Sequence, residues 1–293
     1  MNENYPKLAK VNSLIEKYLP KEGYKFIFRD LVAISRESRL HKKEPQFFPP
    51  AILLVGQGSK SCYVGDQTFD YGAGNILVTM LPIPVAVVVT EASAERPLLA
   101  AGVGIDFARL ANVLLKIENA DQDAFQPIQA NASSIFSTTA KEKLLDAFIR
   151  LLEASEDTRD AEVLSDAIID EIYYRILMDE RNGELRYLLQ KRGEIQRISR
   201  AVEHIHQNLD QPVSVEGLAE LVHMSRSAFF DKFKDVMHVS PLQYAKSVKL
   251  HTAQTLIQEG KKANEAGYLV GYNSPAQFSR EYKRHFGFVP SAT

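Results

Sequence analysis

The sequence has no tryptophan and only one cysteine, Cys62, among its 293 residues. A single cysteine excludes an internal disulfide framework. No apolar run reaches the ~18 residues that a membrane-spanning helix requires; the longest apolar region, 76–89, is interrupted by Pro82 and Pro84. The first residues lack the basic start and apolar centre of a signal peptide. These absences predict a soluble cytoplasmic protein with no membrane partner.

The net charge of −2 gives little sign of nucleic-acid binding, because DNA-binding domains are usually clearly basic. The charge is unevenly distributed, however. Residues 194–293 hold twelve Lys and Arg against ten Asp and Glu, a net charge of +2, which leaves −4 for the rest. Six of the seven histidines also lie in this last part. The asymmetry agrees with a DNA-binding C-terminal domain without establishing one.

Short runs rich in β-branched and aromatic residues predict β-structure up to about Asp106. Pro-rich and Gly-rich segments separate them, and Gly65-Asp66 is typical of a tight hairpin. Many short strands at this spacing predict a small barrel or sandwich. The predicted strands are 24–34, 51–55, 61–64, 76–80, 85–90 and 98–105.

The pattern changes to helix from Phe107 to about Gln190. Apolar residues recur there at i, i+3, i+4 and i+7 spacing, as in the run from Leu144 to Leu152. Polar and glycine-containing stretches follow before residue 194. The predicted domains are therefore 1–180, with a helical region from about 107, a linker over 181–193, and a C-terminal domain over 194–293.

The C-terminal domain contains an internal repeat with a period of 49 residues. Three anchors recur at this interval: Phe229, Phe233 and Pro241 return as Phe278, Tyr282 and Pro290. Each copy has a short helix, a turn and a second helix that a serine can cap. Gly271 can adopt φ > 0 in the second turn, and His223 takes that place in the first. This arrangement predicts two helix-turn-helix units, whose second helices enter the major groove of DNA.

The two recognition helices have distinguishable faces. Phe229, Phe233 and Val236 form an inward stripe in the first, and Phe278, Tyr282 and His285 form one in the second. The predicted DNA-contacting residues lie on the outward faces and are Arg226, Ser227, Phe230, Asp231, Lys234, Pro275, Ala276, Gln277, Arg280 and Lys283. Arg280 can pair with guanine, Gln277 with adenine, and Phe230 can touch a thymine methyl group.

The segment from Ser214 to Pro290 resembles the DNA-binding domain of the AraC/XylS family of transcriptional regulators. The matching motifs include Leu218-Ala219, 240–244 (Ser-Pro-Leu-Gln-Tyr), 270–272 (Val-Gly-Tyr), 278–280 (Phe-Ser-Arg) and Val289-Pro290. The resemblance implies a long helix, here about 241–257, that joins the two units and holds both recognition helices for successive major grooves. It also implies contacts from Ser227, Phe230, Asp231, Pro275, Ala276, Gln277 and Arg280.

Three features depart from the family pattern. His238 stands where the first unit usually has glycine. Phe230 and Asp231 occupy places often held by polar or basic residues, and the chain lacks the basic ending of many relatives.

The region 25–107 resembles the β-rich N-terminal domain of one AraC-type subgroup. Matching motifs are Gly56-Gln57-Gly58, Gly65-Asp66, Tyr71-Gly72, 90–93 and 95–97. The resemblance implies a cupin-like barrel that binds a small effector, mediates dimerisation, or both. Six aromatic residues are predicted to line its effector pocket: Phe28, Phe47, Phe48, Tyr63, Phe69 and Tyr71.

Several alternatives remain beside this reading. A cupin-type enzyme would need two or three histidines and a carboxylate around a metal, whereas His41 is the one histidine before residue 194; we therefore expect no metal, cofactor or catalytic residue. Cys62 could sense oxidants or electrophiles, although a lone strand cysteine is more often a small core residue. The first domain could also respond to a protein partner or to abundance instead of a small molecule.

The combined prediction is an α+β protein: an N-terminal cupin-like β-barrel with flanking helices, followed by an all-α domain of seven helices with two helix-turn-helix units. We expect a homodimer that binds double-stranded promoter DNA and acts on RNA polymerase in response to a small-molecule effector.

Overall fold

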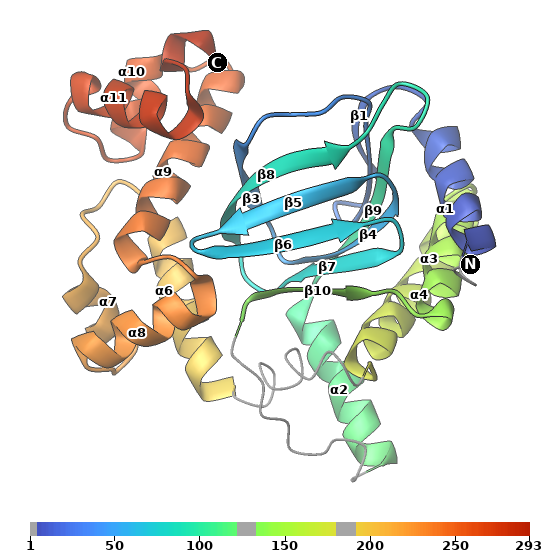
Figure 1. The fold of residues 1–293 in the computed structure, drawn as a ribbon. Helices are drawn as coiled ribbons and strands as arrows, with labels where there is room; N and C mark the ends of the chain where they lie inside the picture. The colour runs from blue at the N-terminus through green and yellow to red at the C-terminus, as the bar shows by residue number, and fades with distance from the viewer. Residues whose placement is uncertain (1–4, 122–132, 180–191) are drawn as a thin grey trace.

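The computed structural model describes residues 5–121, 133–179 and 192–293 and divides into two parts. An N-terminal β-rich domain with helices is followed by a C-terminal helical domain, as Figure 1 shows. The α+β prediction is thereby confirmed. The N-terminal strands form two sheets that pack face to face, so the cupin-like expectation holds without a single closed barrel.

The larger sheet has six antiparallel strands in the order β1-β2-β9-β4-β7-β10. Their bounds are β1 (Gly23–Phe28), β2 (Val32–Glu37), β4 (Ala51–Gln57), β7 (Asn75–Thr79), β9 (Leu98–Gly104) and β10 (Ile135–Thr139). The smaller sheet is β3-β8-β5-β6, made of β3 (Glu44–Phe48), β5 (Ser59–Val64), β6 (Gln67–Gly72) and β8 (Ile83–Glu91).

The two faces of the larger sheet differ in side-chain size, because successive strand residues point to opposite faces. Large aliphatic side chains such as Ile34, Leu99 and Val103 face the helices and belong to one buried cluster. The alternate positions on β9, which face the smaller sheet, are Ala100, Gly102 and Gly104. Small residues on that inner face leave space between the sheets.

Among the described residues, four helices pack beside the sheets of this domain: α1 (Tyr5–Tyr18), α2 (Phe107–Ala120), α3 (Glu142–Ala154) and α4 (Thr158–Leu177). In Figure 1, α1, α3 and α4 lie together on the side of the sandwich away from the C-terminal domain. Their apolar faces form the first core with the larger sheet. The helical prediction after Phe107 is confirmed for α2, α3 and α4.

Some sequence predictions for this domain were wrong. The β-structure predicted up to Asp106 begins with a helix, α1, whose apolar residues Leu8, Val11, Leu14 and Ile15 follow helical spacing. The predicted strand 24–34 is two strands joined by a turn in which Arg29 has φ 47°. β10 lies in a segment predicted to be helical. The hairpin at Gly65-Asp66 is confirmed, with Val64 paired to Gln67.

The C-terminal domain consists of α6 (Arg192–Gln207), α7 (Val215–Leu221), α8 (Arg226–Met237), α9 (Pro241–Gln258), α10 (Ala263–Leu269), α11 (Pro275–Phe286) and the 3₁₀ helix η2 (Pro290–Ala292). The range 192–293 thus holds seven helices, as predicted, of which six are α-helices and the last is a 3₁₀ helix. Most of the predicted linker, 181–193, lies outside the described residues, and α6 has already begun at Arg192.

Candidate nucleic-acid interface and effector cavity

Serine side chains fix where both recognition helices begin. Ser225 accepts a hydrogen bond from the backbone N–H of Ala228 at the start of α8, and Ser274 accepts one from Gln277 at the start of α11. Ser240 opens α9 with a full capping box, in which the Ser240 backbone N–H donates to Gln243 Oε1. Each cap satisfies an otherwise unpaired backbone N–H, so the serines determine the first residue of both recognition helices.

The two turns share one left-handed position, as the repeat predicts. His223 has φ 54° in the first turn and Gly271 has φ 84° in the second. Gly267 allows close packing of α10 on α11, because a Cβ there would lie 2.9 Å from the ring of Phe278. Both turns therefore depend on a left-handed residue, as helix-turn-helix geometry requires.

The predicted inward stripes are confirmed. Phe229, Phe233 and Val236 are fully buried, as is Tyr282, and Phe278 is nearly so. His285 is half-buried against His251 of α9, with ring centroids 5.1 Å apart. These contacts fix both recognition helices to α9, which at 18 residues is about 27 Å long.

The opposite faces of α8 and α11 lie in solvent. All ten predicted DNA-contacting residues occupy these faces: Arg226, Ser227, Phe230, Asp231, Lys234, Ala276, Gln277, Arg280 and Lys283 are exposed, and Pro275 is half-exposed at the start of α11. Phe230 leaves 38% of its area exposed. The fold thus brings together two outward faces on one helical scaffold.

Ion pairs and hydrogen bonds orient two of the predicted DNA-contacting side chains, Arg226 and Gln277. Arg226 Nε lies 2.9 Å from Glu216 Oε1 of α7. Glu281 receives hydrogen bonds from Tyr272 (3.0 Å) and Gln277 (3.4 Å) and pairs with Lys246 of α9 (3.1 Å). Burial raises the pKa of the Glu281 carboxyl, but these partners outweigh burial and lower it overall. Glu281 is therefore charged and orients Gln277, a role that the sequence reasoning missed.

The N-terminal domain contacts the side of the C-terminal domain that does not carry these faces. The backbone N–H and the hydroxyl of Ser134 both donate to the Val236 carbonyl, at 3.0 and 2.6 Å. Ser133 Oγ lies 2.8 Å from His238 Nε2, and Phe69 of β6 packs on the His238 ring. The end of α8 is thus docked on the β-sandwich while its outer face stays open.

A cavity of about 530 Å³ lies between the two sheets. Its floor holds many small residues, namely Ala33, Ala51, Ala100, Gly102 and Gly104, beside Leu53 and Leu77. Aromatic side chains of β1 and β3, namely Tyr24, Phe26 and Phe48, form part of the wall. The volume lies in the range typical of small-molecule sites. The alternation of small residues on β9 was the sequence signal that could have located it.

The polar end of the cavity is an ion pair between Lys60 of β5 and Glu37 of β2. The Lys60 side chain is only 9% exposed, so the pair is largely removed from water. Tyr71 lies opposite Lys60 in the sheet, and its buried hydroxyl has no hydrogen-bond partner among the described residues. Nearby Cys62 is buried, and burial raises the pKa of its thiol to about 12. At neutral pH this thiol is therefore protonated, which weakens the case for a redox sensor.

Of the six aromatic residues predicted for an effector pocket, Phe48 lies on the cavity wall. Phe28 and Tyr71 are buried in the cores. Phe47 and Phe69 contact the C-terminal domain, and Tyr63 lies beneath the Lys43 ammonium group. The structure does not bring these six side chains together around one space.

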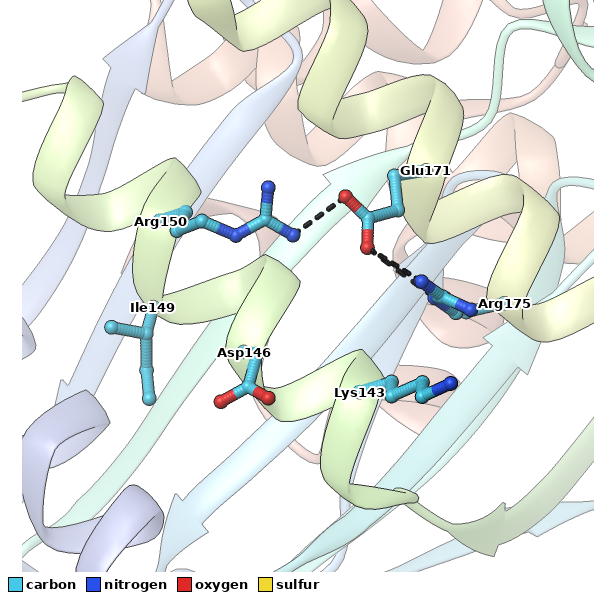
Figure 2. Close-up of a pocket in the computed structure, with 6 residues that line it drawn as sticks. All are labelled: Lys143, Asp146, Ile149, Arg150, Glu171 and Arg175. Carbon is cyan, nitrogen blue, oxygen red and sulfur yellow. Dashed lines mark hydrogen bonds and ion pairs between the residues drawn. The ribbon is translucent and has the colours of Figure 1, made fainter.

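A second, open hollow lies between α3 and α4 and is lined by charged side chains (Figure 2). Arg150 and Arg175 both bond to Glu171, at 2.5 and 3.1 Å, and Asp146 pairs with Lys7 of α1. Burial alone would raise the pKa of Glu171, but the two arginines lower it overall. The carboxylates of the hollow are already bound by the protein's own cations, which indicates a structural role for it.

Two further features of the described ranges bear on function. Among them, no group of three or more His, Cys, Asp or Glu side chains is placed to hold a metal ion. No helix in the described part of the chain is long and apolar enough to span a membrane.

Two family models match the chain. Residues 30–184 match the AraC-type transcriptional regulator N-terminus, and residues 218–293 match a helix-turn-helix domain. The first match alone covers more than half of the chain, and the second lies in the C-terminal domain.

Known proteins are similar over the same regions. The lactose operon transcription activator of Staphylococcus xylosus is 23% identical over 273 residues, covering 93% of this chain and 86% of that protein. The transcriptional regulator AlkR of Acinetobacter baylyi is 34% identical over 94 residues, 32% of this chain and 31% of its own.

Among solved structures, ToxT of Vibrio cholerae with an unsaturated fatty acid bound has a similar fold. The TM-score is 0.55 at 10% identity, covering 89% of this chain and 92% of that one. The likeness extends over both domains and shows that the arrangement of a β-rich domain beside a helical one is shared.

Proposed function

Since this chain belongs to the AraC/XylS family and is a DNA-binding transcriptional regulator, we propose that α8 and α11 read two successive major grooves of promoter DNA. We further propose that the cavity between the sheets binds a small effector that controls this binding.

The observation that supports the DNA-reading proposal is the exposure of both outward helix faces while the two domains are docked. Nine of the ten residues are exposed and Pro275 is half-exposed. α9 holds the two helices on one scaffold, and ~27 Å of helix is compatible with two grooves ~34 Å apart. Lys234 and Lys283 supply positive charge to phosphates, Arg280 can pair with guanine, and Asp231 can accept a bond from cytosine N4.

A footprint on the DNA that flanks the protein's own gene tests this proposal. We expect protection over two successive major grooves on one side of the duplex. Binding should weaken steeply as salt rises, because contacts to phosphates release counterions. Protection of a single groove, or affinity that salt leaves unchanged, would argue against a two-unit reader.

Removing Arg280 should relax sequence preference. We expect Arg280→Ala to cost about 1–3 kcal/mol at its preferred base pair, because a bidentate contact to guanine is lost. Lys283→Ala is the matched control on the same helix: its loss should weaken binding about equally at all sequences and lower the salt slope by about one. Binding measurements on a set of single-base variants distinguish the two patterns. If Arg280→Ala binds every sequence as the parent does, α11 reads bases with other residues.

The cavity supports an effector with an apolar body and one polar group. The small-residue floor and the rings of Tyr24, Phe26 and Phe48 suit a flat apolar body. Lys60 and Glu37 are available to a polar group at one end. ToxT, which shares the fold, binds an unsaturated fatty acid, so amphipathic carboxylic acids are a sensible first class to screen by thermal shift.

The remaining parts of the proposal concern assembly and location. Val163 and Leu164 of α4 and Leu115 of α2 are exposed apolar side chains, 68%, 45% and 45% accessible, and we propose that this helical surface forms a homodimer. The protein would act in the cytoplasm on RNA polymerase at promoters, without enzymatic activity, as its relatives are transcriptional regulators. Sedimentation of the Val163→Glu variant against the parent tests the dimer.

A further inference from the structure

The edge strand β3 alternates its side chains between the cavity and the DNA-binding domain. Gln46 and Phe48 line the cavity. Phe47, between them, points the other way, since neighbouring strand residues face opposite sides. Its ring centroid lies 5.6 Å from His206, 6.1 Å from Tyr244 and 5.9 Å from His251. Figure 1 shows β3 on the side of the sandwich that faces α9.

Through Phe47 the strand reaches both helix-turn-helix units. His206 belongs to α6, which packs on the first unit, and His251 belongs to the connecting helix α9. The Nε2 atom of His251 lies 3.2 Å from Nε2 of His285 in α11, the second recognition helix. A displacement of Phe47 therefore acts on α6 and α9, the helices that set the spacing of α8 and α11.

Within its sheet, β3 is held by few hydrogen bonds. β3 pairs with β8 alone in the described sheet, and the ladder includes Pro45 and Pro84, neither of which has an N–H to donate. In contrast, the chain entering β8 is fixed to α9, because the Tyr244 hydroxyl donates to the Pro82 carbonyl at 2.8 Å. Since a hydroxyl has one proton, His206 Nε2 is then the donor to Tyr244 Oη, also at 2.8 Å. β3 can shift against this fixed point.

We propose that β3 transmits the occupancy of the cavity to the DNA-binding domain. The inference rests on the proposed effector site and assigns how that site is coupled. A ligand that fills the space presses on Gln46 and Phe48, and the strand carries the displacement to Phe47. The ring then moves against α6 and α9 and changes the relative placement of the two recognition helices. Small displacements at packed contacts are sufficient for such a change, because close-packed contacts switch between discrete arrangements.

The test fills the cavity by substitution, so that it needs no known ligand. Gly102 lies on the other sheet, and a Cβ there would first meet Leu53 Cδ1 at 3.4 Å, an ordinary contact. Gly102→Leu therefore projects the rest of its side chain into the cavity. The affinity for the footprinted DNA is measured for the parent and for Gly102→Leu, each with and without Phe47→Ala. Ala100→Leu, from the same strand face, replaces Gly102→Leu if the latter does not fold.

We expect cavity filling to change the DNA affinity by roughly fivefold or more, the lower end of typical allosteric couplings. This change should disappear in the Phe47→Ala background. Phe69→Ala is the matched control, since Phe69 also contacts the C-terminal domain but does not line the cavity; the change should persist there. An equal change in DNA affinity with and without Phe47 overturns the role of β3 but does not contradict the effector site. No change in the parent background contradicts the effector site as well.

The absence of tryptophan provides a direct readout of the motion. The Phe47→Trp variant has a single indole, placed beside His206 and His251. Its emission should shift when Gly102→Leu is added, whereas the indole of a Phe69→Trp variant should keep its emission. Unchanged emission at position 47 in the folded, cavity-filled protein would overturn the proposal.

Discussion

Replacing Gly65 with alanine should detach α8 from the β-sandwich while each domain stays folded. Gly65 is the first residue of the two-residue turn between β5 and β6 and has φ +56°. A Cβ at this position would overlap the backbone carbonyl oxygen of His238 and lie 3.0 Å from its carbonyl carbon. Because a backbone oxygen cannot rotate away like the end of a side chain, the contact itself has to open.

Opening this contact removes several interactions at once. Ser134 loses two hydrogen bonds to the Val236 carbonyl, Ser133 loses its bond to His238, and Phe69 loses the His238 ring. At about 1 kcal/mol for each hydrogen bond, docking weakens by roughly 3 kcal/mol. The Tyr244–Pro82 bond and the contacts of Phe47 join the domains elsewhere, so the variant tests whether they suffice alone. If they do not, as we expect, small-angle scattering should show a larger radius of gyration and heating should unfold the two domains in separate transitions.

Two further variants separate the steric clash from backbone strain. Gly260→Ala changes a glycine at φ +98° where a Cβ meets no atom within 4 Å, so it should cost only the ~1–2 kcal/mol of left-handed strain and leave the domains docked. Gly65→Asn tolerates the left-handed backbone but still carries a Cβ, and it should undock the domains like alanine. A Gly65→Ala protein with the parent's radius and a single transition would show that this contact does not hold the domains together.

The DNA-binding half could be predicted closely from the sequence because its determinants are local. The 49-residue repeat, the capping serines and the apolar stripes each act within a few turns of helix, and Phe233 and Tyr282 are buried as their spacing requires. His238 was recognised as standing in place of a glycine, and it does take the left-handed conformation, φ 57°, that Gly287 takes in the second unit. The reason for a histidine at this position is not local, because its side chain contacts Ser133 and Phe69 of the other domain.

The residues that line the cavity could not be predicted from the chemistry of each residue alone. Aromatic residues on strands can face a core, a cavity or a partner domain, and which of these applies depends on strand pairing far along the chain. Phe47 and Phe48 are neighbours with the same chemistry, yet one contacts His206 and the other lines the cavity. The space itself results from small residues such as Ala100 and Gly102, whose alternation becomes meaningful only when the second sheet is known to lie opposite.

Acidification should destabilise the C-terminal domain and its contact with β3. Burial, together with the neighbouring His285, lowers the pKa of His251 from 6.5 to about 4. Burial also lowers the pKa of His206 and of His285, the latter with a further contribution from Lys246. His251 is therefore neutral in the folded protein at neutral pH, packed against Phe47 and Phe286.

The direction of the effect follows from proton binding. The unfolded chain binds a proton on His251 near pH 6.5, whereas the folded chain resists it until about pH 4. The contribution of neutral His251 to the free energy of unfolding is thus complete above pH 6.5 and is lost as pH falls toward 4. At about 1.4 kcal/mol for each pKa unit, His251 alone should lower the free energy of unfolding by about 2 kcal/mol at pH 5.

Urea unfolding measured between pH 7 and pH 5 tests this expectation in a window above the usual carboxylate pKa values. The His251→Gln variant has no titrating group at this position, so its stability should fall much less over the window, whatever its stability at pH 7. His204→Gln is the matched control, because His204 lies exposed on α6, and it should keep the parent's pH profile. If His251→Gln and the parent lose stability in parallel, the acid sensitivity resides elsewhere. A smaller pH dependence in His251→Gln would instead show that stability depends on an uncharged His251, whose ring packs against Phe47 of β3.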